Sequence, residues 1–258
     1  MGADRMPVAF VGHGNPLNFV MEDRYEGWVT WAGSLPRPTG ILTVSAHWED
    51  APATIGRTLN HHELLYDFYG FPDFMYEVSW PAPGAPGLAD RLEALLGPHL
   101  PLVRADRLLD HGAWVPLARM FPEADIPVLQ LSMPMTMVET DLLALGAELS
   151  PLRDEGVLIL ATGNAVHDLR NAVFTGDVKP PGYAVGFDNW VQARLEQRDD
   201  TALADWMNAA PDALRAHPSA EHFRPLVVAA GAAGASPARF PLTGFEHGTI
   251  SRRCVQFG

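Results

Sequence analysis

The chain has ten histidines and a single cysteine, Cys254. Three of the histidines, His13, His47 and His167, stand at or just past the end of a short apolar run, where a buried strand would end. Neutral imidazole is the commonest metal ligand in proteins, and it suits borderline ions such as Zn(II) and Fe(II). Because one cysteine cannot build a thiolate cage, histidines are the natural candidates for holding a divalent metal ion.

Two further histidines have neighbours that fit a site. His222 is predicted at the start of the last apolar helix, with Ser219 as its N-cap, and Glu221 beside it could supply a carboxylate ligand instead. Two histidines and one carboxylate form the usual non-haem Fe(II) arrangement, so the residues alone leave this choice open. His111 follows Asp110 in a pattern that predicts the first turn of a helix.

The other histidines give weaker signals. His61 and His62 lie in a polar stretch that predicts an exposed loop, and His99 follows a predicted helix end. The motif around His247 favours no particular role. Arg252 and Arg253 next to Cys254 could lower the pKa of its thiol, but we do not expect this cysteine to act as a nucleophile.

The elements that must position these histidines alternate along the chain. Short apolar runs predict strands over 8–12, 41–46, 128–132 and 157–162, and apolar spacing of three and four predicts helices over 88–96, 114–121, 138–149, 187–195 and about 222–233. Alternating strands and helices favour an α/β fold with a central, mostly parallel sheet flanked by helices. We expect one domain over residues 1–258, with a metal site at the carboxyl ends of the strands.

Composition restricts the class of protein. The hydrophobic content of 47% is enough for a sizeable core, and no run of about 18 apolar residues predicts a membrane span. The first residues lack the apolar segment of a secretory signal, so we expect a cytoplasmic protein. The formal net charge of −13 argues against a nucleic-acid-binding surface.

Several motifs together carry a resemblance to a known family. They include Gly12-His13-Gly14-Asn15-Pro16, Asp110-His111-Gly112-Ala113-Trp114 and Gly163-Asn164-Ala165-Val166-His167. In order, the matching segments are 12–16, 35–38, 44–48, 66–72, 76–84, 110–114, 163–167 and 221–226, with a shorter match ending in Phe257-Gly258. The chain resembles the class III extradiol ring-cleavage dioxygenases, in the branch of the 4,5-DOPA extradiol dioxygenases.

The resemblance implies an activity and a set of site residues. It implies a single metal centre, Fe(II) when active, which Zn(II) can also occupy. The metal ligands would be His13, His47 and His222, with His167 as acid/base catalyst and a further ligand in some settings, and His111 beside the substrate. The substrates would be a catechol and O2, and the ring would open beside the diol.

The sequence departs from the family pattern at two places. Some members have histidine where this chain has Tyr66, which could alter the pocket, and members often have methionine where this chain has Arg252. Two other classes stay open. A zinc hydrolase could use three of the same histidines with His167 as base, and a metal- or ligand-binding protein would bind without turnover. Neither the catechol nor the oligomeric state can be identified from the sequence.

Overall fold

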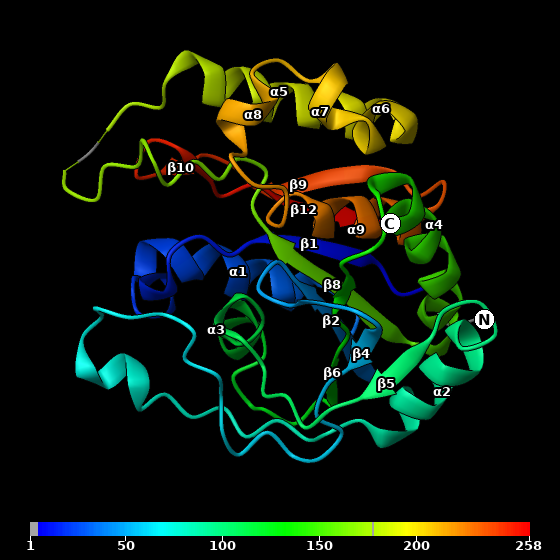
Figure 1. The fold of residues 1–258 in the computed structure, drawn as a ribbon. Helices are drawn as coiled ribbons and strands as arrows, with labels where there is room; N and C mark the ends of the chain where they lie inside the picture. The colour runs from blue at the N-terminus through cyan, green and yellow to red at the C-terminus, as the bar shows by residue number, and fades with distance from the viewer. Residues whose placement is uncertain (1–4, 177) are drawn as a thin grey trace.

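The computed structural model describes residues 5–176 and 178–258 (Figure 1). Within them, the helices are α1 (Glu22–Ser34), α2 (Pro86–Leu96), α3 (His111–Met120), α4 (Glu139–Leu149), α5 (Gly182–Gln197), α6 (Asp200–Ala204), α7 (Trp206–Ala209), α8 (Ala213–Ala216) and α9 (Arg224–Ala233). The strands are β1 (Val8–Gly12), β2 (Gly40–Ser45), β3 (Glu49–Asp50), β4 (Ala53–Ile55), β5 (Leu102–Arg104), β6 (Val128–Gln130), β7 (Met133–Pro134), β8 (Val157–Gly163), β9 (Ala238–Leu242), β10 (Phe245–Glu246), β11 (Ile250–Ser251) and β12 (Cys254–Phe257).

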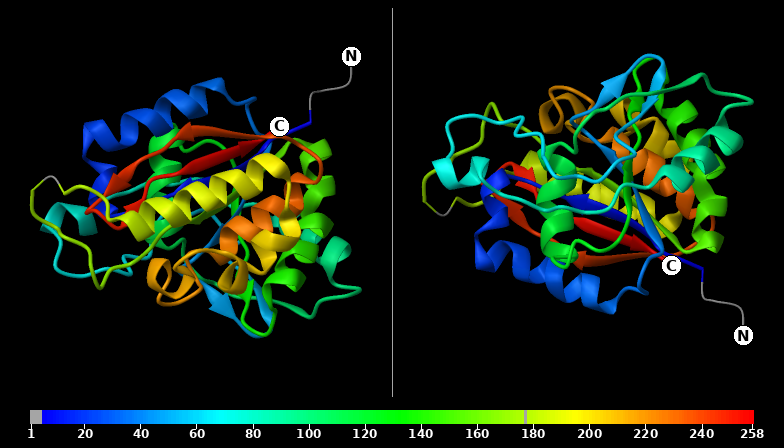
Figure 2. Two further views of the ribbon diagram at one scale, coloured as in Figure 1. Left: turned by 90° about the horizontal axis from the view of Figure 1, so that it is seen from above. Right: turned by 90° about the horizontal axis from the view of Figure 1, so that it is seen from below.

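A six-stranded sheet in the order β6-β2-β8-β1-β12-β9 forms the centre of the fold. β6, β2, β8 and β1 pair in parallel, which confirms the predicted α/β fold with a mostly parallel sheet. β12 pairs antiparallel with β1, and β9 pairs antiparallel with β12. In Figure 2 these C-terminal strands, in red, run beside the blue β1. Their short, mixed sequences gave no strand prediction.

Helices cover both faces of the sheet, because alternate residues of each strand point to opposite sides. In β1, Val8 and Phe10 join the core formed with α4 and α9, while Ala9 and Val11 join the core formed with α1 and α3. Figure 1 shows these two pairs of helices on opposite sides of the strands. Burial on both faces explains why the parallel strands read as continuous apolar runs. No helix in the described part of the chain is both long and apolar enough to cross a bilayer.

The last helix begins later than its sequence pattern predicts. α9 starts at Arg224, with Phe223 at the N-cap position and Pro225 in the first turn. Ser219 does not cap it, because its hydroxyl donates to Oε1 of Glu221 at 2.9 Å. Proline is favoured in the first turn, where its missing N–H costs nothing. His222 therefore lies in the turn before the helix, not in it.

The prediction of an exposed His61 was wrong. The side chain is 1% exposed, and its Nε2 lies 3.1 Å from the carbonyl oxygen of Val128, to which it donates. Its neighbour His62 is exposed, as predicted. A polar stretch can still turn one ring inward when a strand carbonyl accepts a hydrogen bond from one of its nitrogens.

Cys254 is buried, and burial raises the pKa of its thiol to about 11. Arg252 and Arg253 act in the opposite direction, but less strongly than burial. The arginine neighbours therefore do not activate the thiol, because desolvation of the thiolate decides its protonation. This agrees with our expectation that Cys254 is not a nucleophile.

Candidate metal centre

Three parallel strands place histidines at the same edge of the sheet. Gly12 pairs with Gly163 and Ser45 pairs with Thr162, so the carboxyl ends of β1, β2 and β8 lie level. His13 follows β1 directly, and His47 follows β2. The turn before α9 adds His222, whose carbonyl oxygen accepts the N–H of Asn164 at 2.9 Å. A side chain at Gly163 would collide with that carbonyl, so the glycine permits this close approach.

The three side chains converge with their ring nitrogens close together. Nε2 of His13 lies 3.1 Å from Nε2 of His47. The ring of His222 is centred 5.4 Å from that of His13 and 4.9 Å from that of His47. One ligand atom from each of the three lies within 4.8 Å of the other two, so a single ion could contact all three. The predicted convergence is thus present, while the ligand roles stay a prediction.

Hydrogen bonds fix the tautomer of His13. Its Nδ1 lies 2.9 Å from Oγ1 of Thr162, and that hydroxyl donates its proton to the carbonyl oxygen of Gly112 at 2.6 Å. The hydroxyl must therefore accept from His13, because it has only one proton to donate. Nδ1 of His13 carries the hydrogen, and the lone pair of Nε2 faces His47. Such outer hydrogen bonds orient the histidine ligands of metal sites.

Glu221 supports His222 in a similar way. Its Oε1 lies 3.1 Å from Nδ1 of His222, the distance of a hydrogen bond from a neutral imidazole to a carboxylate. That contact leaves Nε2 of His222 free for a metal ion. His167, Glu221 and His222 also form a group whose ligand atoms lie within 4.8 Å of one another. The carboxylate of Glu221 therefore lies near the site, as the sequence allowed, but it contacts Nδ1 of His222.

His167 stacks on His222, with ring centres 3.5 Å apart and planes 11° from parallel. Its backbone is held from two sides, since its N–H donates to Ala216 and it forms a bridge with Ile250. The next residue, Asp168, accepts from the Tyr183 hydroxyl at 2.5 Å and from Asn171 at 2.8 Å. The ring of His167 is thus placed by a rigid segment that follows β8.

His111 occupies the first turn of α3, as predicted, with Asp110 as its N-cap. Its ring is centred 4.0 Å from that of His47. Asp67 accepts from both the backbone N–H and Nδ1 of His111, each at 2.9 Å. Nδ1–H therefore points to the carboxylate and Nε2 stays free. Burial raises the pKa of Asp67, but the hydrogen bonds and charge of His111 outweigh it and lower that pKa to about 2.

The converging imidazoles are held in the neutral form that metal binding requires. Burial, with the neighbouring His47, lowers the pKa of His13 well below its usual range, and burial and His167 do the same for His222. Burial and His111 lower the pKa of His47 to about 4. Burial and His217 lower the pKa of His167 to about 3. Each pKa is lowered for the same physical reason. Burial removes the water that would stabilise the protonated ring, and the neighbouring imidazoles repel a positive charge.

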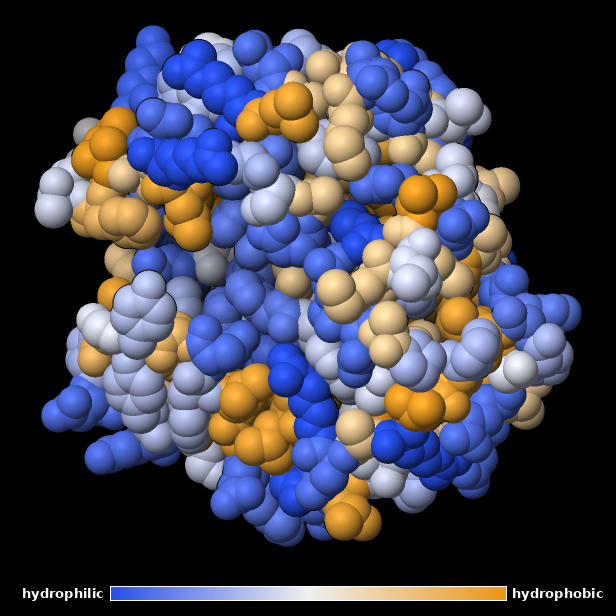
Figure 3. Space-filling view, in the orientation of Figure 1, coloured by the Kyte–Doolittle hydropathy of each residue, from blue (hydrophilic) through white to orange (hydrophobic). Residues whose placement is uncertain are grey.

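A cavity of about 680 Å³ opens in front of these rings. The histidines His13, His47, His111, His167 and His222 line its inner end. Its walls come from the segments 14–17, 67–72, 169 and 174, and from Ile250. Figure 3 shows the molecule hollowed at the left between the loop before α5 and the loop around residue 70, with hydrophobic side chains along the upper border. The shape and lining fit a flat aromatic ligand with one polar edge.

Comparison with known proteins then identifies the family of the chain. Residues 11–258 match the model of the catalytic LigB subunit of aromatic ring-opening dioxygenase.

The chain belongs to the LigB family.

Curated relatives agree with this assignment. The protein named 4,5-DOPA dioxygenase extradiol from Escherichia coli (strain K12) is 36% identical, over 100% of this chain and 97% of that protein. The protein of the same name from Beta vulgaris is 41% identical, over 87% of this chain and 86% of its own. A crystal structure of an uncharacterized Escherichia coli K12 protein superposes with a TM-score of 0.84 at 36% identity, covering 98% of this chain and 100% of that one. The resemblance found in the sequence is confirmed, and with it the class of enzyme, an extradiol aromatic ring-opening dioxygenase.

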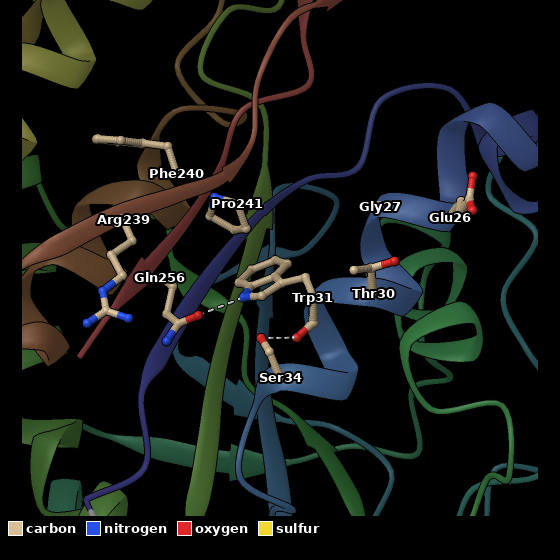
Figure 4. Close-up of a pocket in the computed structure, with 9 residues that line it drawn as sticks. All are labelled: Glu26, Gly27, Thr30, Trp31, Ser34, Arg239, Phe240, Pro241 and Gln256. Carbon is tan, nitrogen blue, oxygen red and sulfur yellow. Dashed lines mark hydrogen bonds between the residues drawn. The ribbon is translucent and has the colours of Figure 1, made fainter.

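A second cavity, of about 580 Å³, lies between α1 and β9, away from the histidines (Figure 4). Trp31 donates from Nε1 to Oε1 of Gln256 at 2.9 Å and closes one side of it. Glu26 and Arg239 are the charged residues in its lining. Among the described residues that line this cavity there is no histidine or cysteine, so it is a weaker candidate for the catalytic site than the histidine-lined cavity.

The loop carrying His13 is anchored by a buried carboxylate from the C-terminal part of the chain. Glu246 accepts the N–H of Asn15 at 2.6 Å and the side-chain amide of Asn18 at 2.9 Å. Asn18 also donates to the carbonyl oxygen of His13 at 3.1 Å. Gly14 has φ +58, and a Cβ there would collide with the carboxylate of Glu246. A glycine is therefore required where the loop folds over this group.

We expect Glu246→Gln to lower the free energy of unfolding by about 1–3 kcal/mol, because the amide cannot accept from both donors and leaves one of them unpaired in the interior. Glu26→Gln, on the exposed face of α1, is the matched control and should change stability little. Urea denaturation of both variants measures the difference. Equal stability of the two variants would contradict the anchoring role of Glu246.

Several supporting residues were not identified from the sequence. Thr162 was seen only as the end of a strand, and Asp67 only as part of an aromatic motif. Tyr66 is not among the residues that line the cavity. Its hydroxyl donates to the carbonyl of Val78 at 2.7 Å. Arg252 donates to the carbonyl of Arg24 at 2.9 Å. Neither departure from the family pattern touches the converging histidines.

Proposed function

We propose that this chain is an Fe(II)-dependent extradiol dioxygenase that opens the ring of a catechol beside the diol, using both atoms of O2. We further propose that residues 1–258 act as one catalytic domain. His13, His47 and His222 would hold the ion, His167 would move a proton and could add a fourth ligand, and His111 would contact the substrate. The names of the relatives from Escherichia coli and Beta vulgaris support a catechol substrate.

One observation carries the proposal. Three imidazoles converge at the closed end of a cavity, and for two of them the hydrogen bonds to Thr162 and Glu221 leave Nε2 unprotonated and inward-facing. Neutral imidazole nitrogens at this spacing fit one divalent ion of the borderline class. The open side toward the cavity leaves room for a ligand that is not part of the protein. The donor set therefore fits the metal that the family implies.

When bound, an Fe(II) ion supplies a Lewis acid for the two hydroxyls and a path for electrons between the ring and O2. The protein's own residues supply position and proton transfer. His167 is suited to take the proton of one catechol hydroxyl, because no hydrogen bond engages its side chain within the described residues and its ring borders the cavity. His111, held by Asp67, presents Nε2 to the same space.

The apolar wall of the cavity would hold the ring and keep bulk water away from it. Phe68 lies with its ring centre 5.7 Å from that of His111 and 5.0 Å from that of Phe71. These side chains favour a flat ring by contact with its faces and edges. Orienting both reactants in one place is the main contribution that a protein makes when a metal ion supplies the difficult chemistry.

Metal replacement tests the proposal. The protein is stripped of metal, reconstituted without oxygen with Fe(II) or Zn(II), and then given a catechol and air. We expect oxygen uptake and a yellow ring-opened product with Fe(II) and neither with Zn(II), because zinc has no redox chemistry. Histidine sites usually bind Zn(II) more tightly than Fe(II). A purified sample can therefore hold zinc.

Three results would count against the proposal. Equal ring cleavage with zinc would contradict the need for a redox-active ion. Hydrolysis of an ester or amide by the zinc form, without oxygen uptake by the iron form, would favour the zinc hydrolase instead. Metal binding without any turnover would favour a binding protein.

A further inference from the structure

The segments that carry His167 and His222 are joined through their backbones. The N–H of Asn164 donates to the carbonyl oxygen of His222 at 2.9 Å, and the N–H of His167 donates to that of Ala216 at 3.0 Å. The two imidazole rings stack with their centres 3.5 Å apart. The position of one ring over the other therefore depends on how these two backbone segments lie against each other.

A buried side chain adds a third hydrogen bond between the same segments. His217 directly follows α8 and is 1% exposed. Its Nε2 lies 3.0 Å from the carbonyl oxygen of Ala165, two residues before His167. Burial lowers the pKa of His217 to about 4, so the ring is neutral at physiological pH and has a single N–H. Because a carbonyl oxygen can only accept, that hydrogen is on Nε2 and is donated to Ala165.

Aromatic side chains surround the ring of His217. Its centre lies 5.3 Å from that of Phe187, 5.4 Å from that of Trp206 and 5.3 Å from that of Phe223, the residue after His222. Nδ1 has no hydrogen-bond partner within the described residues. A leucine or phenylalanine would fill this space without burying a nitrogen, so packing alone does not explain a histidine here. The hydrogen bond from Nε2 is the interaction that an apolar side chain cannot make.

We propose that His217 is a positioning residue that holds His167 at the place over His222 from which it can take a proton from the catechol. The inference rests on the proposed function, and it adds a residue that is not part of the cavity lining. One side chain contacts both segments, because its nitrogen fixes Ala165 and its ring packs on Phe223. A shift of a catalytic group by about 1 Å can lower turnover by about 100-fold.

The test removes the hydrogen bond and then restores it. His217→Leu keeps an apolar side chain of similar size but has no donor, while His217→Gln carries an amide N–H that can reach the same carbonyl oxygen. The readouts are kcat and KM with a catechol on the Fe(II) form, and iron content. We expect His217→Leu to lower kcat by about 10–100-fold with KM and iron content nearly unchanged, and His217→Gln to recover most of that loss.

His61→Leu is the matched control. His61 is likewise 1% exposed, donates from Nε2 to a backbone carbonyl and has no partner for Nδ1 within the described residues. It lies outside the cavity lining. Both leucine variants should lower the midpoint of urea denaturation, because each loses a buried hydrogen bond, but only His217→Leu should lower kcat. Equal kcat in the two leucine variants, or an equal loss in His217→Leu and His217→Gln, would overturn the inference.

Crystal structures of the variants separate this inference from the proposed function. In His217→Leu we expect the rings of His167 and His222 to move apart from their 3.5 Å separation or to lose their parallel stacking. An unchanged stack would overturn the inference whatever the activity. Loss of iron in parallel with kcat would show that the hydrogen bond supports metal binding instead of proton transfer, and would also contradict it.

Two further outcomes leave the inference testable. If the unmodified protein opens no catechol ring, the proposed function fails, while the ring separation in the crystal structures still decides whether His217 positions His167. If His217→Leu does not fold, His217→Phe takes its place, because it keeps a ring among the aromatic side chains and also lacks the donor.

Discussion

Changing His13, His47 or His222 singly to alanine is expected to remove most of the bound metal and nearly all ring-cleaving activity while the fold is kept. Each substitution removes one of the three converging imidazoles, whose ligand atoms lie within 4.8 Å of one another. Even groups that only support metal ligands contribute about 10–100-fold to affinity, so loss of a ligand should weaken binding by more than about 100-fold.

Elemental analysis after gel filtration measures the metal, and circular dichroism checks the fold. His62→Ala is the matched control, because His62 is an exposed histidine outside the cavity lining and should leave the metal content unchanged. Near-stoichiometric metal in all three site variants would refute the assignment of these ligands. Loss of metal only from the variants at His13 and His47 would point to Glu221 as the third ligand.

Replacing His167 should lower turnover by about 10²–10⁴-fold, the usual contribution of a positioned acid–base group, with metal content nearly unchanged. His167→Phe is the sharper variant. It keeps an aromatic ring that can stack on His222, whose ring centre is 3.5 Å away, and removes both nitrogens. His167→Asn removes the stacking as well.

The readouts are kcat with a catechol on the Fe(II) form and metal content by elemental analysis. Loss of metal in parallel with activity would show that His167 is itself a fourth ligand. Wild-type turnover in both variants would move the proton-transfer role elsewhere, and His111 would be the next residue to change, since Asp67 holds its ring toward the same cavity.

The parallel half of the fold could be predicted because its strands are buried on both faces. β1, β2 and β8 read as unbroken apolar runs, and the histidines after them had to meet at one sheet edge. The antiparallel strands β9 and β12 gave no such signal. β9 is an edge strand with alternately half-buried and exposed residues, and it includes a proline, which edge strands tolerate.

The site was predictable only as far as the histidines that converge in it. His222 was singled out beside a helix, yet its place depends on a backbone contact with Asn164 that no local pattern encodes. The same holds for Thr162, Asp67 and Glu246, whose partners are distant in the sequence. The prediction for His61 failed for a related reason. The carbonyl oxygen that accepts a hydrogen bond from its ring belongs to Val128 in β6, which is distant in the sequence.

The pairing of β12 with β1 and the position of His222 have a consequence for how the protein is made. A ribosome releases His13 and His47 well before His222 and before β12, the strand that pairs with β1. The proposed three-histidine site cannot form until His222 has been made, because it requires segments that are distant in the sequence to have folded together. If the proposed ligands hold an ion, it would be bound only after these distant segments have folded together, from whichever metals are then available.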